Sequence, residues 1–330
     1  MTLYTGRRQE VGIGKEGTRG DGDDNDYWMP KTAVTFDDKV RKSLVAGSYG
    51  NITDAAMTGY VTGKWAEGDI EGEINVNSFG LILLALCGAE SAGGDIGGGV
   101  YDHTYTLANT NTHQSLVLRI VDPVESVWFR RVMINSLSID ITLGEIVKYT
   151  ANFMSRVHQT LATESPTYAI DHRFIARDLV LQLAPAFDSD WTDFTTYPQI
   201  SVKNLTLEFA KNIGTLDVVN TLEPEDIVNK GFKVTGSLEL NYEDKTWRNY
   251  MLNNTTRAMK IVLASRKGIG TASFPTWTMI FPKVHFDTWE PVNALDDITS
   301  QTINFDIYYD LANTRLWSSF VLRNTVASDY

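Results

Sequence analysis

The residues of this chain that could carry out chemistry are five histidines, one cysteine and several groups of carboxylates. A metal site or a catalytic base would favour histidines at HxH or HxxxH spacing. None of the five lies at such a spacing: they are His103, His113, His158, His172 and His285. We therefore expect packing and interface roles for them, no metal and no enzyme. A catalytic triad built from distant residues stays open, although no GxSxG motif nominates a serine.

Cysteine and glycine patterns point the same way. Cys87 is the single cysteine, which excludes an intrachain disulfide and a cysteine-based zinc site. It lies in the apolar run LILLALCG, and we interpret it as a buried small hydrophobic residue. The glycines at 12–14 and 97–99 lack the strand-then-helix context of a phosphate loop, so we expect no cofactor.

The carboxylates are more informative. Asp69, Glu71 and Glu73 alternate along a strand pattern whose other face is apolar. Glu223–Asp226 forms a second group around Pro224, which we interpret as a solvated loop. For the first group, a solvated strand face and an acidic surface that faces a channel both remain open. A glycosidase-like pair would need two carboxyls across a cleft, and the sequence does not indicate one.

The elements that position these carboxylates occur twice. Gly68–Leu84 (GDIEGEINVNSFGLILL) aligns without a gap with Gly236–Leu252 (GSLELNYEDKTWRNYML), and Glu145–Phe153 aligns with Asp297–Phe305 in the same order. The difference in residue number between aligned positions falls from 168 in the first pair of segments to 152 in the second. The first half is therefore the longer one between the two segments. We place this difference in the glycine-rich stretch at 92–99. Glu239 is equivalent to Glu71, which adds it to the candidate acidic face.

Composition excludes several classes. The 330 residues are 43% hydrophobic and 21% charged, as in soluble globular proteins, and the repeat favours two cores over one. A net charge of −12 argues against a surface that grips nucleic-acid phosphates. The start of the chain lacks a signal-peptide h-region, and the longest apolar stretch, Leu81–Cys87, is too short to span a membrane. We therefore expect a soluble product of a cytoplasm.

The fold class that these patterns predict is mainly β, a β-dominated α+β chain with two tandem β-sandwich or partial-barrel domains. Each domain carries one short helix behind a strand pair, over 77–87 and 245–252, with Asn77 or Ser78 as N-cap and Gly88 as C-cap of the first. The predicted division is an N-terminal arm (1–30), a first domain (31–160), a linker (161–198) and a second domain (199–330). The arm is rich in glycine and charge, so we expect it to order only on a partner.

Five segments in a fixed order carry a family resemblance. They are VGIGKEGTRG (11–20), SFGLILLALCG (78–88), YDHTYTLANTNTHQSLVLRI (101–120), RRVMINSLSIDITLGEIVKYTANFMSRV (130–157) and VTGSLELNYEDKTW (234–247). Together they resemble the tail tube proteins of long-tailed bacteriophages. The resemblance covers nearly the whole chain and implies a virion protein without catalysis.

What the resemblance implies is a tube of stacked rings that conducts DNA and the tape measure protein, without contact with a membrane. Inner strands of neighbouring subunits join there into a continuous barrel around the lumen. A two-domain chain would supply two ring positions, so three copies would form a pseudo-hexameric ring. We then expect Asp69, Glu71, Glu73 and Glu239 to face the lumen, and the arm and the glycine-rich loop to contact stacked rings. Further expected partners are tail terminator and baseplate proteins. The alternatives are a terminator or baseplate hub protein, or a carbohydrate-binding β-sandwich. The eight tryptophans are compatible with the carbohydrate-binding alternative.

Overall fold

A computed structural model describes residues 3–22, 26–44, 50, 52, 59–162, 164–169, 171–186, 194–293, 295–296 and 298–330. Its elements are almost all strands, so the prediction of a mainly β fold is confirmed. The first half contains β1 (Glu10–Lys15), β2 (Tyr27–Met29), β3 (Lys31–Val34), β4 (Asp37–Ser43), β5 (Tyr60–Glu73), α1 (Val76–Cys87), β6 (Gly88–Ala92), β7 (Tyr101–Leu107), β8 (Leu116–Val121), β9 (Ser126–Thr142), β10 (Lys148–Ser155) and β11 (Gln159–Thr160).

The second half repeats much of this order. It contains β12 (Leu179–Pro185), β13 (Gln199–Ile200), β14 (Asn204–Ala210), β15 (Ile213–Leu216), β16 (Asp226–Asn229), β17 (Lys233–Asn241), α2 (Thr246–Leu252), β18 (Arg257–Ala264), β19 (Thr276–Val292), β20 (Ser300–Ile307) and β21 (Ser319–Asn324). Short 3-10 helices lie at Gly6–Arg8 and Ala176–Asp178.

The repeat seen in the sequence is a repeat of strand pairing. Gly68 of β5 lies opposite Phe153 of β10, and Gly236 of β17 lies opposite Phe305 of β20. The register shifts by one residue at equivalent places, in β9 between Ile134 and Ser136 and in β19 between Phe286 and Thr288. The series β1, β2, β3–β4, β5, α1, β8, β9, β10 thus corresponds to β12, β13, β14, β17, α2, β18, β19, β20.

The difference in length between the halves has two sources, so the expectation of a single insertion in the first half was too simple. Leu116 of β8 faces Val132, and its counterpart Arg257 of β18 faces Val284. The difference in residue number between equivalent positions of the two halves is 168 at Gly68 and Gly236 but only 141 at Leu116 and Arg257. The first half is therefore longer before β8, where the β6–β7 hairpin lies. The difference in residue number then rises to 152 at Val132 and Val284, so the second half is longer between β18 and β19. The two extra loops touch, since a Cβ on Gly98 would lie 2.6 Å from the Thr271 nitrogen.

The predicted N-terminal arm contains two strands of the first half. β1 pairs along its whole length with β8, and Val11 and Ile13 are buried in the core. β2 pairs with β1. The expectation that residues 1–30 order only on a partner is therefore wrong for these segments, because apolar side chains alternate with the glycines of β1 and pack inward. In the predicted linker, β12 is equally the first strand of the second half.

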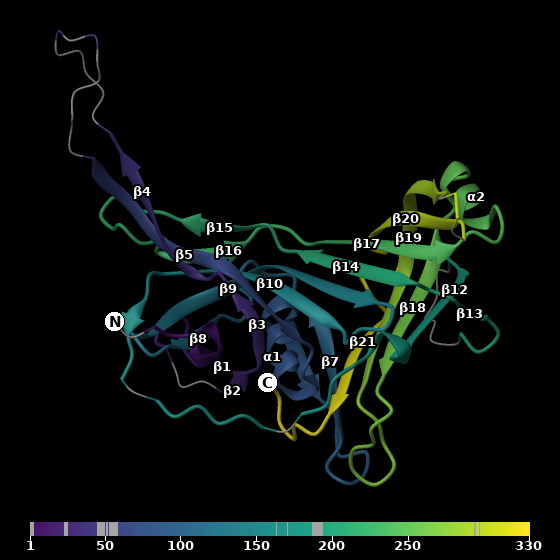
Figure 1. Ribbon diagram of the computed structural model, residues 1–330, viewed down its shortest axis with the longest axis horizontal. Helices are drawn as coiled ribbons and strands as arrows, with labels where there is room; N and C mark the ends of the chain where they lie inside the picture. Colours follow the sequence, from purple (N-terminus) through teal and green to yellow (C-terminus); the bar gives the residue numbers. More distant parts are fainter. Residues whose placement is uncertain are drawn as a thin grey trace.

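The two halves form one continuous sheet (Figure 1). β9 pairs with β10 of its own half on one side and with β14 of the second half on the other, from Ser136–Ala210 to Thr142–Asn204. A second connection runs from β7 to β21. One hydrophobic core spans both halves, with the rings of Phe79 in α1 and Trp277 in β19 packed at 5.2 Å. We call the β9–β14 pairing the intrachain joint.

The two helices occupy equivalent places but unequal surroundings. In α1, eleven of twelve residues are buried, and Gly88 ends the helix in the left-handed conformation (φ 87°), as predicted. The helix begins at Val76, and the Asn77 N–H is capped by Asp171 Oδ2 at 2.8 Å rather than by the predicted Asn77 or Ser78 side chain. In α2, Trp247 alone is buried. Because α1 is covered by β7 and β21, the second connection between the halves also encloses this helix.

A long hairpin of β4 and β5 extends away from the body beyond the first half (Figure 1). Its described part carries exposed apolar side chains, namely Val40, Leu44, Tyr60 and Val61. Its counterpart in the second half, the β15–β16 hairpin, lies back against the first half instead. Among the described residues, no helix combines the length and apolarity needed to cross a membrane.

Candidate functional site

The candidate site is a polar face that runs across both halves of the sheet. Alternate residues of its strands point away from the core, whereas their neighbours Ile70, Leu137, Leu207 and Leu238 are fully buried. We define the polar face by Thr35, Asp37, Glu67, Asp69, Glu71, Glu73, Ser136, Ser138, Asp140, Thr142, Lys148, Thr150, Asn152, Asn204, Thr206, Glu208, Lys233, Thr235, Ser237, Glu239, Thr288, Glu290, Thr302, Asn304 and Asp306.

All four sequence-predicted site residues lie on this face. Glu71 is exposed. Asp69 accepts a hydrogen bond from Asn152 Nδ2 at 2.7 Å, and Glu73 forms an ion pair with Arg173 at 2.5 Å. Glu239 lies four strands away on β17, and its Oε2 accepts a hydrogen bond from Asn204 Nδ2 at 2.5 Å. The structure thus gathers three of them on β5 and separates the fourth by β10, β9 and β14.

The sequence prediction missed most of the polar face. Asp140 and Glu208 are two further carboxylates on it, next to the intrachain joint. Thr206 Oγ1 of the second half donates to Asp140 Oδ1 of the first at 3.1 Å, so the face is continuous across the joint. The alternation of polar and apolar residues at 136–140 (SLSID) and 204–208 (NLTLE) is the signal that would have identified both strands.

The charge of the polar face is strongly negative. The residues that define it include ten carboxylates and two lysines, Lys148 and Lys233. Both lysines are already paired, Lys148 with Glu145 at 2.5 Å and Lys233 with Asp306 at 3.3 Å. The Glu145 carboxylate raises the pKa of Lys148. Serine, threonine and asparagine fill the remaining positions, and Lys39 of β4 continues the row of Asp37 beyond them, so carboxylates and neutral hydrogen-bonding groups outnumber cations.

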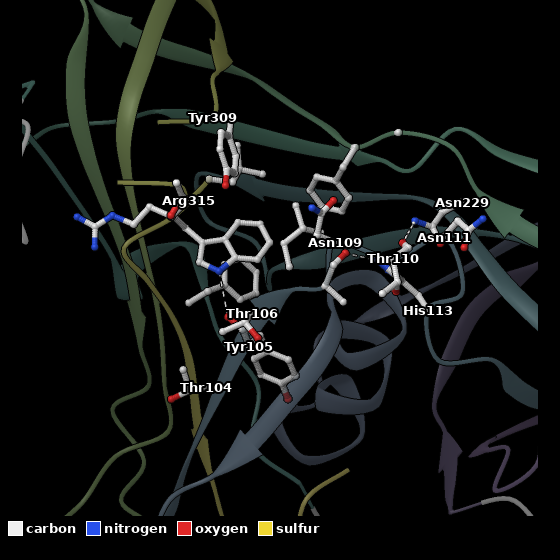
Figure 2. Close-up of a pocket in the computed structure, with 18 of the residues that line it drawn as sticks. Thr104, Tyr105, Thr106, Asn109, Thr110, Asn111, His113, Asn229, Tyr309 and Arg315 are labelled. Atoms are coloured by element: carbon white, nitrogen blue, oxygen red, sulfur yellow. Dashed lines mark hydrogen bonds between the residues drawn. The ribbon is translucent and has the colours of Figure 1, made fainter. Parts of the chain in front are cut away.

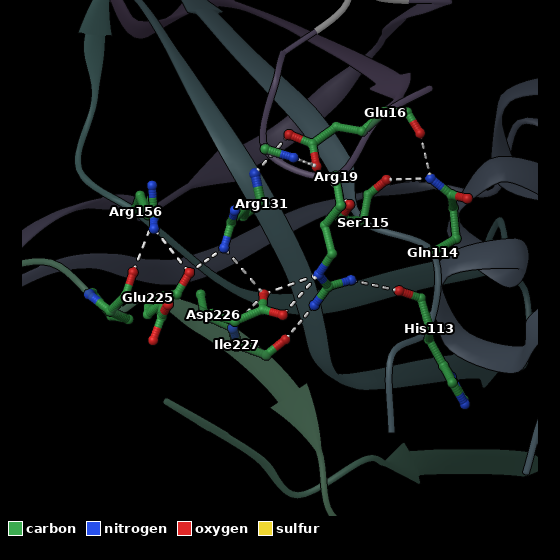
Figure 3. A network of polar contacts seen from close by, with 12 residues as sticks. Glu16, Arg19, His113, Gln114, Ser115, Arg131, Arg156, Glu225, Asp226 and Ile227 are labelled. Atoms are coloured by element: carbon green, nitrogen blue, oxygen red, sulfur yellow. Dashed lines mark hydrogen bonds and ion pairs between the residues drawn. The ribbon is translucent and has the colours of Figure 1, made fainter. Parts of the chain in front are cut away.

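Three arginines hold the β15–β16 hairpin of the second half against the first half (Figure 3). Arg19 Nε lies 2.9 Å from Asp226 Oδ1, and its Nη2 donates to the Ile227 carbonyl at 2.5 Å. Arg156 donates to the carbonyls of Pro224 and Glu225 at 3.0 and 2.8 Å. Arg131 reaches the Glu225 carbonyl and Asp226, the latter at 3.6 Å.

This network changes the interpretation of the second acidic group. The segment 223–226 was expected to be a solvated loop, but its backbone and Asp226 are anchored by the three arginines. Burial, together with Arg131 and Arg130 close by, lowers the pKa of Arg156. Half-buried guanidinium groups are stabilised by such acceptors, so the acidic segment serves to fasten one half to the other.

A groove of about 1200 Å³ lies at the junction of the halves, between β7, the 108–113 loop, the 229–232 loop and the 309–320 segment. Figure 2 shows Tyr309 and Arg315 on one side of this groove and Asn109, Thr110, Asn111 and Asn229 on the other. Its histidine, His113, has both ring nitrogens near the carbonyls of Leu86 and Ala108, at 3.2 and 2.9 Å. Burial lowers the pKa of His113. The groove therefore presents aromatic, hydroxyl and amide groups together with Lys230 and Arg315, and its described lining contains no carboxylate.

The other sequence candidates for chemistry are dispersed. His103 is buried beside Glu90 (2.7 Å), and His158 contacts Asp38 at 2.5 Å on another part of the sheet. Over the described part of the chain, no group of three or more histidine, cysteine, aspartate or glutamate residues is placed to hold a metal ion. Cys87 is buried as predicted, and burial raises the pKa of its thiol.

The fold and the polar face together define a β-rich protein made of two equivalent halves joined edge to edge. The chain belongs to the phage tail tube protein family, which it matches over residues 6–307. No curated protein sequence matches it. It is therefore a structural component of a virion, and membership of the family implies self-assembly into a tube.

Proposed function

We propose that three copies of this chain close into a ring with pseudo-sixfold symmetry, and that stacked rings form the tail tube through which DNA passes from capsid to host. The tube also houses the tape measure protein and is bounded by terminator and baseplate proteins. In this assembly the tail is of the long, siphovirus type. The two ring units of each chain are then the predicted domains at 31–160 and 199–330, extended by β1 and β2 in the first unit and by β12 in the second.

The observation that carries this proposal is the intrachain joint. β9 of one unit pairs with β14 of the next, and these strands occupy opposite edges of equivalent units. Such a contact is heterologous, and a heterologous contact closes into a ring when its rotation divides a full turn. Each chain still offers one edge of each kind, β3–β4 at one end and the C-terminal part of β19 at the other. Three chains supply six units to such a ring.

The polar face supports the passage of DNA. A lumen of fixed cations would hold the phosphate backbone through counterion release. The ten carboxylates of the polar face would instead repel it, and the hydroxyl and amide groups between them offer weak contacts. We therefore assign Asp69, Glu71, Glu73 and Glu239 to the lumen wall, with Asp140 and Glu208 beside them.

Electron microscopy of the purified protein at high concentration tests the assembly. We expect rings or tubes with a central hole, and classes of rings should show six similar lobes with threefold differences between alternate ones. A monodisperse monomer at all concentrations and salt conditions would contradict the proposal.

Charge reversal tests the lumen assignment. The double variant Glu71→Lys/Glu239→Lys changes equivalent positions of the two units, so we expect normal tubes but DNA ejection slowed at least about tenfold, because ammonium groups bind phosphates. Ejection is followed as DNA release from virions triggered in vitro. The Glu71→Gln/Glu239→Gln variant controls for lost hydrogen bonds, and Glu125→Lys, in the exposed β8–β9 turn, controls for added charge. Normal ejection by the double lysine variant would refute the assignment.

A further inference from the structure

We propose that the joint between chains repeats the intrachain joint residue for residue, with β19 of one copy antiparallel to β3–β4 of the next and Glu290 opposite Asp37. This inference rests on the proposed ring and adds to it the edges, the direction and the register of the contact. Its partner is a second copy of this chain.

The equivalence of the strands fixes the register. Equivalent residues of β9 and β19 differ by 152 in number, because Ser136 faces Asn152 in the first half as Thr288 faces Asn304 in the second. Equivalent residues of β3–β4 and β14 differ by 171 in number, because Val34 faces Ile70 in the first half as Leu205 faces Leu238 in the second. The intrachain pair Ser138–Glu208 therefore becomes Glu290–Asp37 between chains.

Both edges are open within one copy. Over the described residues, β19 from Phe286 to Val292 pairs with β20 alone, and β3 and β4 pair with β5 alone. The Thr35 N–H donates inward to the Asp69 carbonyl at 2.9 Å. Thr35 and Phe36 connect β3 to β4 and keep the register with β5, since Val34 faces Ile70 and Asp37 faces Glu67. The alternation of backbone groups therefore places the Phe36 N–H at the free edge.

The direction of the backbone groups agrees with this register. In the intrachain joint, the Lys211 N–H donates to the Asn135 carbonyl and the Leu143 N–H to the Lys203 carbonyl, at 2.8 and 3.2 Å. Odd-numbered residues of β9 thus make the hydrogen bonds across the joint, and the Ile139–Leu207 pair is one of them. Its counterpart between chains is Pro291–Phe36, in which the Pro291 carbonyl accepts from the outward Phe36 N–H.

Pro291 also explains why this edge is selective. Proline keeps its place in the ladder with β20, but it offers no N–H on the outward side, which is the side an added strand would use. A proline on an edge discourages pairing with arbitrary strands. The register we propose needs only its carbonyl at this position.

Side chains at the two edges are less buried than their counterparts inside the intrachain joint. Leu137 is fully buried, whereas the equivalent Trp289 is half-buried. Val292 is 50% exposed on β19, and Val40 is 47% exposed on β4. Docking of a second copy would bury this apolar surface, which favours association. The facing carboxylates Glu290 and Asp37 oppose it at low salt, because like charges directly across a sheet repel.

Cysteine pairs test the register. Asp37→Cys/Glu290→Cys places two thiols at a non-hydrogen-bonded pair, where the Cα atoms lie close enough for a disulfide. Asp37→Cys/Thr288→Cys uses the same face with a register shifted by two residues. Ser138→Cys/Glu208→Cys is the equivalent pair inside one chain and shows that the geometry allows oxidation. Cys87 is buried and present in all three variants.

We expect oxidised tubes of the 37/290 variant to give covalent species that end at a trimer on a non-reducing gel, at least about tenfold above the 37/288 variant. The 138/208 variant should form its disulfide within single chains. Tubes that form and oxidise at 138/208 but not at 37/290, or equally at 37/288, would overturn the register while leaving the proposed function intact. The absence of rings and tubes from all variants and the wild type would overturn both.

Discussion

Lys211 is a lysine in an environment that its residue type does not suggest. It follows β14, is fully buried, and its Nζ donates to the Ala85 carbonyl near the end of α1 at 2.7 Å. Burial is the main cause that lowers the pKa of Lys211 to about 7, and Arg19 lowers it further, while Cys87 acts in the opposite direction. A side chain of the second half therefore caps the helix of the first with an amine that titrates near neutral pH.

The depressed pKa makes stability depend on pH in a defined direction. Between the folded pKa of about 7 and the unfolded pKa of about 10.4, the unfolded chain binds more protons at Lys211, so stability rises with pH by up to about 1.4 kcal/mol per unit. The Lys211→Met variant lacks this contribution. We expect the wild type to gain stability relative to it from pH 7 to pH 9.5 in urea unfolding. A constant difference between the two proteins would contradict the shifted pKa.

At the scale of elements, the two helices show how much the neighbourhood of a segment decides. Leu84 of α1 and Leu252 of α2 are the same residue type at equivalent positions of the repeat, yet they are 5% and 61% exposed. α1 is enclosed by β7 and β21, and α2 contacts mainly β19. Helical spacing predicted both segments, but it could not distinguish the enclosed helix from the open one.

The identical leucines form a matched pair of truncations. Leu84→Ala should cost about 2–4 kcal/mol in the unassembled chain, because it leaves a cavity in a packed core. Leu252→Ala should change the free energy of unfolding by less than about 0.5 kcal/mol, as expected at an exposed position. Urea unfolding of both variants measures the difference. Equal losses would mean that α2 is as enclosed as α1 within one chain.

The sequence predicted elements well where a periodic pattern was strong. The helices predicted at 77–87 and 245–252 are present as α1 and α2, and Gly88 ends α1 as expected. The prediction failed where the pattern was weak. β1 alternates glycines with Val11 and Ile13, so composition concealed a buried strand. Asn135 interrupts the alternation of β9, but the interruption is a register shift within one strand, Ser126–Thr142.

The candidate site was predictable only in part, for a physical reason. Alternation placed Asp69, Glu71 and Glu73 on one face of β5 from the sequence alone. The repeat added Glu239, but no local pattern indicates that β9 of one half pairs with β14 of the other. Pairing partners far apart in the chain are chosen by edges and core packing, so the continuity of the polar face required the structure. The anchoring of Asp226 by Arg19, far away in the sequence, was hidden for the same reason.

At the scale of the whole molecule, the covalent link between the halves is a minor part of what holds them together. The intrachain joint, the β7–β21 pairing and the three arginines all cross from one half to the other. The connecting segment 164–169 is mostly exposed. Exposed segments of this kind tolerate insertion and cleavage.

Cleavage of the connection should therefore leave the molecule intact. We expect a variant with a protease site inserted between Thr167 and Tyr168 to elute as one species after complete cleavage, and its two pieces to separate only in denaturant. Size-exclusion chromatography with a gel of the peak measures this. An uncleaved sample of the same variant is the control. Separation of the pieces in native buffer would show that the noncovalent contacts between the halves are weak.

The β6–β7 hairpin belongs to the contact between halves and has no counterpart in the second half, whereas β21 corresponds to β11, since Phe320 faces Met279 as Thr160 faces Val127. In a closed ring of three chains, the six joints would thus alternate between joints within a chain and joints between chains, which differ in mechanical strength. Three would be reinforced by the β7–β21 strand pair, the three arginines and a covalent connection, and three would lack the strand pair and the covalent connection. Under tension or bending, such a ring would part at every second joint, and its breakage products would be whole chains.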